Sequence, residues 1–215
     1  MATDTERLIE ALARGVTPVR SQAVLRRILL GMLCGGAVTL ALVVAVLGVR
    51  RDLHAAVHGF SFWMKWTYTL SVGVAAIVAV SRLARPTERS LRPLWPVAVP
   101  VLLLTGIGVG ELARTPAQQW LAMWLGHSWK VCPWLVLGLS APIFVGLLWS
   151  FRRLAPTRLR AAGAAAGLAA GAWAATLYCL HCPEVSAVFV LTWYSLGILL
   201  AAGAGALLGP KLLRW

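Results

Sequence analysis

The sequence predicts an all-α membrane protein, a six-transmembrane-helix bundle with both termini in the cytoplasm. Hydrophobic residues make up 60% of the 215 positions and charged residues only 13%, with a mean hydropathy of +0.79, which does not fit a soluble domain. Apolar stretches of about 20 residues recur, each long enough to cross a hydrocarbon core about 30 Å thick. The basic residues gather in alternate connecting segments, which orients the bundle.

The first 27 residues are expected to form a cytoplasmic segment with one short amphipathic helix. Leu8, Ile9 and Leu12 share a face at helical spacing, and Gly15 ends the pattern. A helix of three turns is marginal in water, so it needs a surface to stabilise it. That surface is the bilayer, the protein's own cytoplasmic loops, or a soluble partner whose groove accepts the apolar stripe. Acids are mixed with bases on the polar face, which disfavours a pure anionic-lipid anchor.

The remainder, residues 28–215, is expected to be a single transmembrane domain. Its six predicted spans cover residues 28–49, 60–80, 94–113, 131–151, 161–180 and 186–208. No connecting segment is long enough for a second domain. Several glycines within the spans recur four residues apart, a spacing that lets helices approach closely. These glycines are Gly31 and Gly35, Gly106 and Gly110, Gly163, Gly167 and Gly171, and Gly205 and Gly209.

The distribution of positive charge places both termini in the cytoplasm. Fifteen of the 20 lysines and arginines lie in the N-terminal segment, in the second and fourth connections, or at the C-terminus. The other connections hold only Arg50, Arg51, Arg114 and Lys130, and Lys65 lies just inside the second span. Because cytoplasmic segments carry the excess of basic residues, the net charge of +13 is explained by topology. It is therefore no argument for direct binding of nucleic acid.

Cysteine and histidine are concentrated on the predicted outer face. Cys34 lies within the first span and is expected to be a small packing residue. The remaining candidates for chemistry are His54, His58, His127 and His181, together with Cys132, Cys179 and Cys182. This one-sided distribution indicates that the outer face carries the functional site.

Cys132 and Cys182 share a local context. Each is followed by proline and precedes a span that runs from outside to inside. Since proline suits the first helical position, both cysteines are expected near helix N-caps, where the helix dipole favours a reactive thiolate. If the fourth and sixth helices are neighbours, a disulfide or a soft metal ion can bridge the two sulfurs.

Cys179 and Cys182 also form a C-x-x-C pair around His181. Three interpretations stay open for the outer cysteines: a permanent disulfide, inert interface residues, or a switchable redox or metal sensor. His127 and His181 lie nearest the cysteines, so a bound soft metal ion would take its ligands from Cys132, Cys182, His127 and His181. No other cofactor is expected.

Two ionisable side chains lie near the outer ends of spans. Glu111 and Lys65 are costly in lipid unless they face protein, water or each other, and we expect an ion pair between them. A proton or ion pathway usually also places ionisable groups near mid-membrane, and the other spans lack them. The pattern therefore argues against a transporter.

The end of the chain resembles the NrsF-like family of six-helix bacterial anti-sigma factors. The similarity rests on Leu180-His181-Cys182-Pro183-Glu184, followed by Phe189 and by Trp193-Tyr194-Ser195-Leu196-Gly197. Further landmarks agree in order: the segment 4–18, Phe62-Trp63 with Lys65 and Tyr68-Thr69, Arg82-Leu83-Ala84-Arg85-Pro86, and Ser128-Trp129 with Cys132. The resemblance thus covers nearly the whole chain.

The resemblance implies a multi-pass regulator of the bacterial inner membrane, and not an enzyme. Such a protein holds an extracytoplasmic-function sigma factor inactive on the cytoplasmic side and releases it under stress. The family's two outward cysteines match Cys132 and Cys182, whereas Cys179 lies outside that pattern and joins the site only as an open alternative. The sigma-binding role falls to Leu8, Ile9 and Leu12.

The hypothesis is therefore an anti-sigma factor whose outward cysteines respond to oxidants or heavy metals. The rival is a membrane thiol-disulfide oxidoreductase coupled to quinone. Enzymes of that kind generally need two outward cysteine pairs, and only three outward cysteines occur here. The count disfavours the enzyme.

Overall fold

The structure is a computed structural model that describes residues 4–14, 23–83, 92–151 and 158–213. Within these ranges the chain forms helices and no strand. The longer helices are α1 (Asp4–Arg14), α2 (Ala23–Leu42), α4 (Phe60–Leu83), α5 (Ala98–Arg114), α7 (Cys132–Phe151), α8 (Leu159–Tyr178) and α10 (Ser195–Leu212). Short elements join them: α3 (Leu53–Ala56), α6 (Trp120–Leu125), α9 (Ala187–Phe189), the 3₁₀ turns η2 (Arg92–Val97) and η3 (Ala117–Gln119), and the π-helical turns η1 (Val43–Leu47) and η4 (Val190–Tyr194).

Five helices of the described chain are long and apolar enough to cross a membrane. They run over Leu25–Leu47, Phe60–Leu83, Trp95–Arg114, Cys132–Phe151 and Ala187–Leu212, and they match five of the six predicted spans. The remaining predicted span, 161–180, which is the fifth in chain order, corresponds to α8, which has 20 residues but is rich in alanine and glycine. Its three glycines lower its mean hydropathy, and α8 is not among the five.

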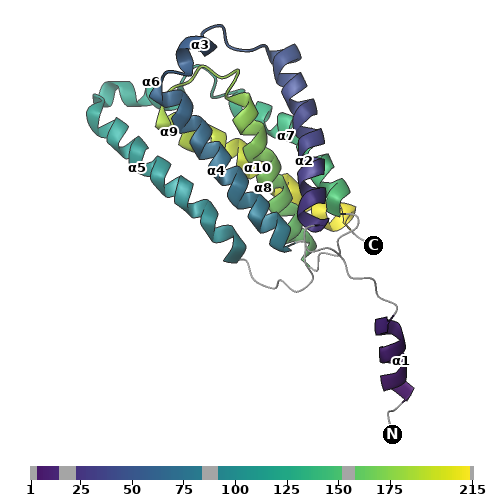
Figure 1. Ribbon diagram of the computed structural model, residues 1–215. Helices are drawn as coiled ribbons and strands as arrows, with labels where there is room; N and C mark the ends of the chain where they lie inside the picture. The colour runs from purple at the N-terminus through teal and green to yellow at the C-terminus, as the bar shows by residue number, and fades with distance from the viewer. Residues whose placement is uncertain (1–3, 15–22, 84–91, 152–157, 214–215) are drawn as a thin grey trace.

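Helix α8 forms the centre of the bundle, with α4, α7 and α10 packed around it (Figure 1). Its closest neighbour is α10, where Gly163 meets Gly205 and Gly167 meets Ala201 so tightly that any added Cβ would strike the opposite backbone. On the far side of α7, Gly31 of α2 meets Gly146 in the same way. The predicted role of glycine in close helix contact is therefore confirmed for the glycines of α2, α8 and α10.

Helix α5 is the exception. Gly106 and Gly110 face open space, because no atom lies within 4 Å of a Cβ built at either position. The prediction of close packing at this pair is wrong, since α5 stands at the edge of the bundle and joins the remainder mainly near its two ends (Figure 1). Cys34, expected to pack within the first span, is instead exposed on α2.

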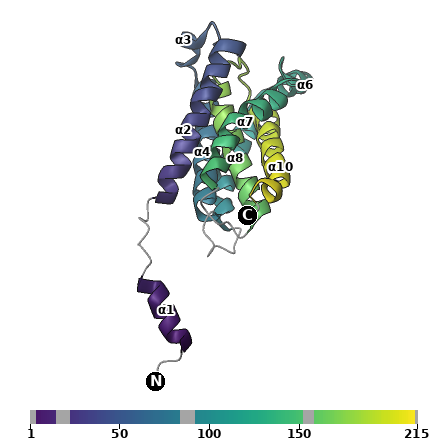
Figure 2. The ribbon, with the colours of Figure 1, turned by 90° about the vertical axis from the view of Figure 1, so that its right-hand side faces the viewer.

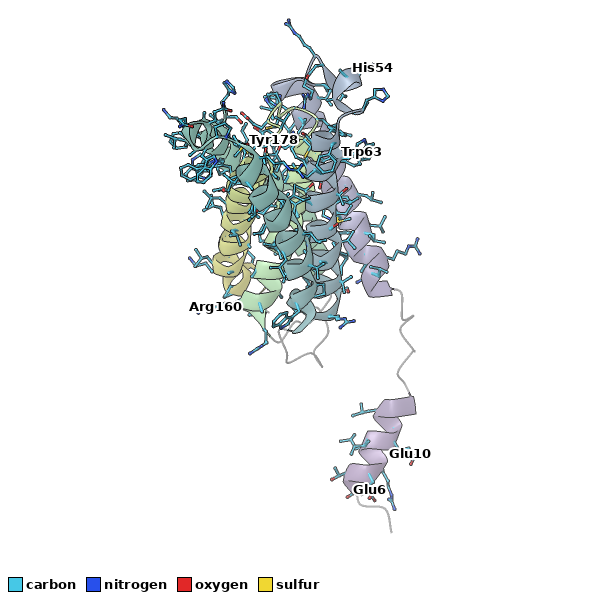
Figure 3. All side chains as sticks on the ribbon, turned by 90° about the vertical axis from the view of Figure 1, so that its left-hand side faces the viewer. Glu6, Glu10, His54, Trp63, Arg160 and Tyr178 are labelled. Carbon is cyan, nitrogen blue, oxygen red and sulfur yellow. The ribbon has the colours of Figure 1, made fainter. Side chains whose placement is uncertain are left out.

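Helix α1 lies apart from the bundle (Figure 2). It confirms the short helix predicted for the N-terminal segment, whereas Gly15, predicted to end that helix, lies outside the described residues. Figure 3 shows Tyr178 and His54 toward one end of the bundle and Arg160 at the other, with Glu6 and Glu10 of α1 beyond the Arg160 end. We call the end that carries Cys132, Cys179 and Cys182 the thiol end.

Candidate functional site

The three cysteines of the thiol end are buried together. Cys132 is the first residue of α7, Cys179 follows the last residue of α8, and Cys182 lies in the connection to α9. All three are free thiols and belong to one hydrophobic cluster that also holds Tyr178 and Tyr194. The topology therefore brings together the two cysteines singled out from the sequence and adds the third beside them.

The helix-cap prediction is confirmed for one cysteine and wrong for the other. Cys132 begins α7, as expected. Cys182 does not precede a helix directly, because α9 begins at Ala187 and its N-cap is Ser186, whose hydroxyl accepts from the Phe189 amide at 3.3 Å. Instead the Cys182 amide donates to the Tyr178 carbonyl at 3.0 Å, which continues the last turn of α8. Cys182 therefore lies at the C-terminal end of a helix and not at a helix N-terminus.

Lys65 holds residues 179–184, which we call the cysteine segment, in place from within the bundle. Its side chain is 0% exposed, and its ammonium donates to the carbonyl of Cys182 at 3.0 Å and to that of Glu184 at 2.6 Å. A buried ammonium group needs such acceptors, because burial of an unpaired charge is very costly. The sequence identified Lys65 only as a membrane-edge residue with a carboxylate partner. Its position in the first turns of an apolar helix was the one indication of a structural role.

The predicted ion pair between Lys65 and Glu111 is wrong. Glu111 instead uses its Oε2 atom to accept from the amides of Ala187 and Val188, at 2.7 and 3.3 Å, and from the Ser186 hydroxyl at 3.1 Å. It thereby satisfies amides that the start of α9 would otherwise leave unpaired. Lys65 and Glu111 therefore both bind main-chain groups at the thiol end and not each other.

Glu184 links the two cysteine-bearing segments. Its Oε1 accepts from the His127 amide at 2.7 Å and from the amide and hydroxyl of Ser128 at 3.0 and 3.1 Å. The Ser128 carbonyl accepts from the Cys132 amide at 2.9 Å, and the Ser128 hydroxyl lies 3.9 Å from the Cys182 sulfur. The carboxylate of Glu184 thus couples the segment before α7 to the segment after Cys182.

Gly126 makes this coupling possible. Its φ of +54° is a conformation that other residues rarely adopt, and a Cβ at this position would strike the Glu184 carboxylate and the Phe189 ring. Sequence reasoning missed both Glu184 and Gly126. The acidic residue within Cys182-Pro183-Glu184 was the available indication, but nothing in its spacing specified its partners.

The connection between α2 and α4 covers the cysteine segment from outside. The Arg50 amide donates to the Leu180 carbonyl at 3.0 Å, and the Arg50 guanidinium donates to the Cys182 carbonyl at 3.3 Å. The same guanidinium pairs with Asp52 at 2.6 Å, which raises the pKa of Arg50 and lowers the pKa of Asp52 to about 2. The Cys182 carbonyl therefore accepts from two cations, Lys65 within the bundle and Arg50 in the connection between α2 and α4.

The four proposed metal ligands are not gathered around one point. The His127 side chain is exposed, with its Nδ1 atom 4.0 Å from Glu184 Oε1, and the His181 Nδ1 atom is 2.9 Å from the Gly48 carbonyl. Within the described ranges, no group of three or more histidine, cysteine, aspartate or glutamate side chains is arranged to hold a metal ion. The site as it stands is a buried thiol centre.

The candidate binding residues of α1 present an exposed apolar stripe. Leu8, Ile9 and Leu12 are 60%, 61% and 65% exposed. These are large fractions for three apolar side chains on one face of a helix, and they leave the stripe available for contact.

Fold and site together define a class of protein: an all-helical membrane protein with a buried thiol centre at one end and a separate amphipathic helix beyond the other. The chain belongs to the NrsF family, whose model, described as negative regulator of sigma F, matches residues 12–215. It is 40% identical over 211 residues to a probable anti-sigma-F factor NrsF of Azospira oryzae, covering 98% of this chain and 99% of the relative. It is 39% identical over 213 residues to the anti-sigma-F factor NrsF of Caulobacter vibrioides, with the same coverage of each chain. No solved structure matches the chain significantly.

Proposed function

We propose that this protein is an anti-sigma factor of the bacterial inner membrane, and a regulator with no catalytic role. The names of its two relatives support this role, since the alignments cover nearly all of each chain. The structural observation that carries the proposal is α1, whose apolar stripe is exposed on a helix detached from the bundle (Figures 1 and 2). The proposed partner is an extracytoplasmic-function sigma factor.

In the proposed topology the chain crosses the membrane six times, with α8 as the fifth span in chain order, and both termini are cytoplasmic. An even number of spans puts α1 and the end of α10 on one side. The excess of basic residues assigns that side to the cytoplasm. The thiol end then faces away from the cytoplasm, and α1 lies where a sigma factor is accessible.

Leu8, Ile9 and Leu12 are the proposed contact residues for the sigma factor. An amphipathic helix of this kind docks its apolar face into a groove of its partner, and large apolar side chains dominate the affinity of such contacts. Docking would also stabilise a helix of 11 residues that is marginal alone. No direct contact with DNA is needed, because the sigma factor is removed from transcription by sequestration.

The proposed signal is oxidation or heavy-metal binding at Cys132 and Cys182, with Cys179 as an additional candidate. Two thiols and one peroxide molecule would yield one disulfide and two molecules of water. A divalent soft metal ion would instead displace the two thiol protons and bind the sulfurs, with His127 or His181 as further ligands after rearrangement. Either event would disturb the Ser128 and Glu184 contacts, because the Ser128 hydroxyl lies beside the Cys182 sulfur and donates to the Glu184 carboxylate.

The thiol change must then weaken sigma binding at the opposite side of the membrane. A hundredfold loss of affinity requires about 2.7 kcal/mol of coupling. A disulfide or a metal site supplies free energies of this order. The route would run through α7 and α10, since Cys132 begins the former and the cysteine segment precedes the latter.

The test is a pull-down of the detergent-solubilised protein from its native cells, with mass spectrometry of the captured proteins. We expect a sigma factor in the reduced sample, and its loss after exposure to peroxide or cadmium. Cys132→Ser with Cys182→Ser should keep sigma bound under both treatments. A sigma factor absent from every sample would refute the anti-sigma proposal. Oxidation of a dithiol by the purified protein with quinone would establish the rival enzyme.

A further inference from the structure

We propose that the groove between α4 and α5 binds one phospholipid whose headgroup carries a phosphate and a primary ammonium group, as in phosphatidylethanolamine. This inference rests on the insertion of the bundle in a membrane and not on sigma binding. The groove consists of two adjoining clefts of about 440 and 350 Å³. Phe60, Met64 and Ile107 line both, so the two clefts lie side by side and share a wall. Volumes of this size are typical of sites for organic ligands.

The groove exists because α5 is held away from α4. Glu111 ties one end of α5 to the start of α9, and η2 leads into the other end along α4. Between these points Gly110 lines the groove but contacts no neighbouring helix. The walls are apolar and open to the exterior: Trp63 of α4 and Leu103 of α5 are 52% and 66% exposed. In a membrane the occupant of such an open apolar channel is an acyl chain.

The polar end of the groove is complementary to a zwitterionic headgroup. Glu111 and Arg114, one helical turn apart on α5, both line this end. Glu111 directs Oε2 at the start of α9, and no hydrogen bond within the described residues uses its Oε1 atom. Arg114 likewise makes no ion pair with any residue of the described chain. A phosphate on Arg114 and an ammonium on Glu111 would satisfy both charges.

This arrangement favours one lipid class over others. An anionic lipid without an ammonium group offers no cation to the Glu111 carboxylate. Its net negative charge would also be repelled by that carboxylate. A quaternary ammonium carries no N–H donor for Oε1. The occupant would also touch Val185 and Ala187, which line the groove, and the Ala187 amide donates to Glu111. The lipid would therefore contact the same connection that carries Cys182.

The experiment is native mass spectrometry of the full-length, delipidated protein, titrated with dioleoylphosphatidylethanolamine or dioleoylphosphatidylglycerol. We expect one tightly bound phosphatidylethanolamine per chain and at least about tenfold weaker binding of phosphatidylglycerol. Arg114→Gln should weaken phosphatidylethanolamine about tenfold, the factor that corresponds to loss of one charge-assisted hydrogen bond. Glu111→Gln keeps an acceptor for the α9 amides but should abolish the preference between the two lipids.

A groove-filling variant tests the acyl-chain part. Ile107→Trp should abolish tight binding, whereas Val109→Trp should not, because Val109 is exposed on the same helix but does not line the groove. Equal binding of both lipids by the unaltered protein, or unchanged binding in Arg114→Gln, would overturn the headgroup assignment. A dimer that dissociates in Ile107→Trp, with no bound lipid, would show that a second copy occupies the groove. Sigma binding is measured separately and has no bearing on these outcomes.

Discussion

The ammonium nitrogen of Lys65 lies 2.6 Å from the carbonyl oxygen of Glu184, inside the bundle and out of contact with solvent. The same nitrogen reaches the Cys182 carbonyl, so one buried cation fixes the main chain on both sides of Pro183. The shape of the cysteine segment thus depends on a residue of another helix.

Replacement of Lys65 by methionine should destabilise the protein. The variant keeps an unbranched side chain of similar length but leaves two carbonyl groups without their donor, at a cost of about 2–4 kcal/mol. The measurement is thermal unfolding in detergent, followed by tryptophan fluorescence. Lys130→Met is the matched control, because Lys130 is exposed and its ammonium lies over the Trp129 ring, 5.4 Å from the centroid. Equal unfolding temperatures for the two variants would contradict the structural role of Lys65.

Loss of the Glu184 carboxylate should expose the thiol centre. In Glu184→Ala the amides of His127 and Ser128 lose their acceptor, and the segment before Cys132 is released from the cysteine connection. We expect the rate of maleimide labelling at Cys182 to rise at least about tenfold, which corresponds to an opening free energy lowered by about 1.4 kcal/mol.

Glu184→Gln retains one acceptor oxygen and should show a smaller increase in labelling. Cys34 supplies an internal reference in each sample, since it is exposed on α2, away from the thiol end. If Cys182 and Cys34 accelerate together in Glu184→Ala, the variant has unfolded globally and the local role is refuted.

The contact between α8 and α10 should tolerate no added methyl group at Gly205. A Cβ there meets the Gly163 backbone, so Gly205→Ala forces the helices apart and should cost about 1–3 kcal/mol. Gly203→Ala on the same helix meets nothing within 4 Å and should be neutral or slightly stabilising through helix propensity. Thermal unfolding of both variants measures the difference. A Gly205→Ala protein as stable as Gly203→Ala would show that the close approach is not required.

The pair of Arg50 and Asp52 predicts a pH dependence. The pKa of Asp52 is lowered to about 2 by its hydrogen bonds to Arg50, below the ordinary value of 3.8. A group with a lowered folded pKa contributes stability above its ordinary pKa, and this contribution is lost as the pH falls through the folded value. The unfolding temperature of the unaltered protein should therefore exceed that of Asp52→Asn by a small, constant amount above about pH 4. The difference should shrink between about pH 4 and pH 2, and a difference that grows on acidification would contradict the pairing.

Much of the fold could be predicted from the sequence because the membrane imposes strong rules on it. Long apolar stretches gave the spans, and the second prediction, 60–80, shares its first residue with α4, Phe60–Leu83. Glycine spacing correctly indicated the contact of α8 with α10 but failed on α5. The spacing allows close approach without requiring it, and whether a partner helix is present depends on the remainder of the bundle.

The candidate site was predictable in its chemistry and less so in its geometry. Proline after Cys132 and Cys182 indicated two similar helix starts, yet only Cys132 begins a helix. At Cys182 the last turn of α8 continues, and three further residues precede the Ser186 cap. The partners of Lys65, Glu111 and Glu184 are largely main-chain atoms, which carry no sequence pattern. Such contacts become visible only when segments distant in the chain are placed together.

The cationic side chains of Lys65 and Arg50 both donate to the main-chain carbonyl oxygen of Cys182, an atom that every amino acid supplies. The Cys182 sulfur takes no part in these two contacts, so its chemistry and the anchoring of the main chain rest on different atoms. A substitution at Cys182 leaves the acceptor for both hydrogen bonds in place, whatever side chain replaces the thiol.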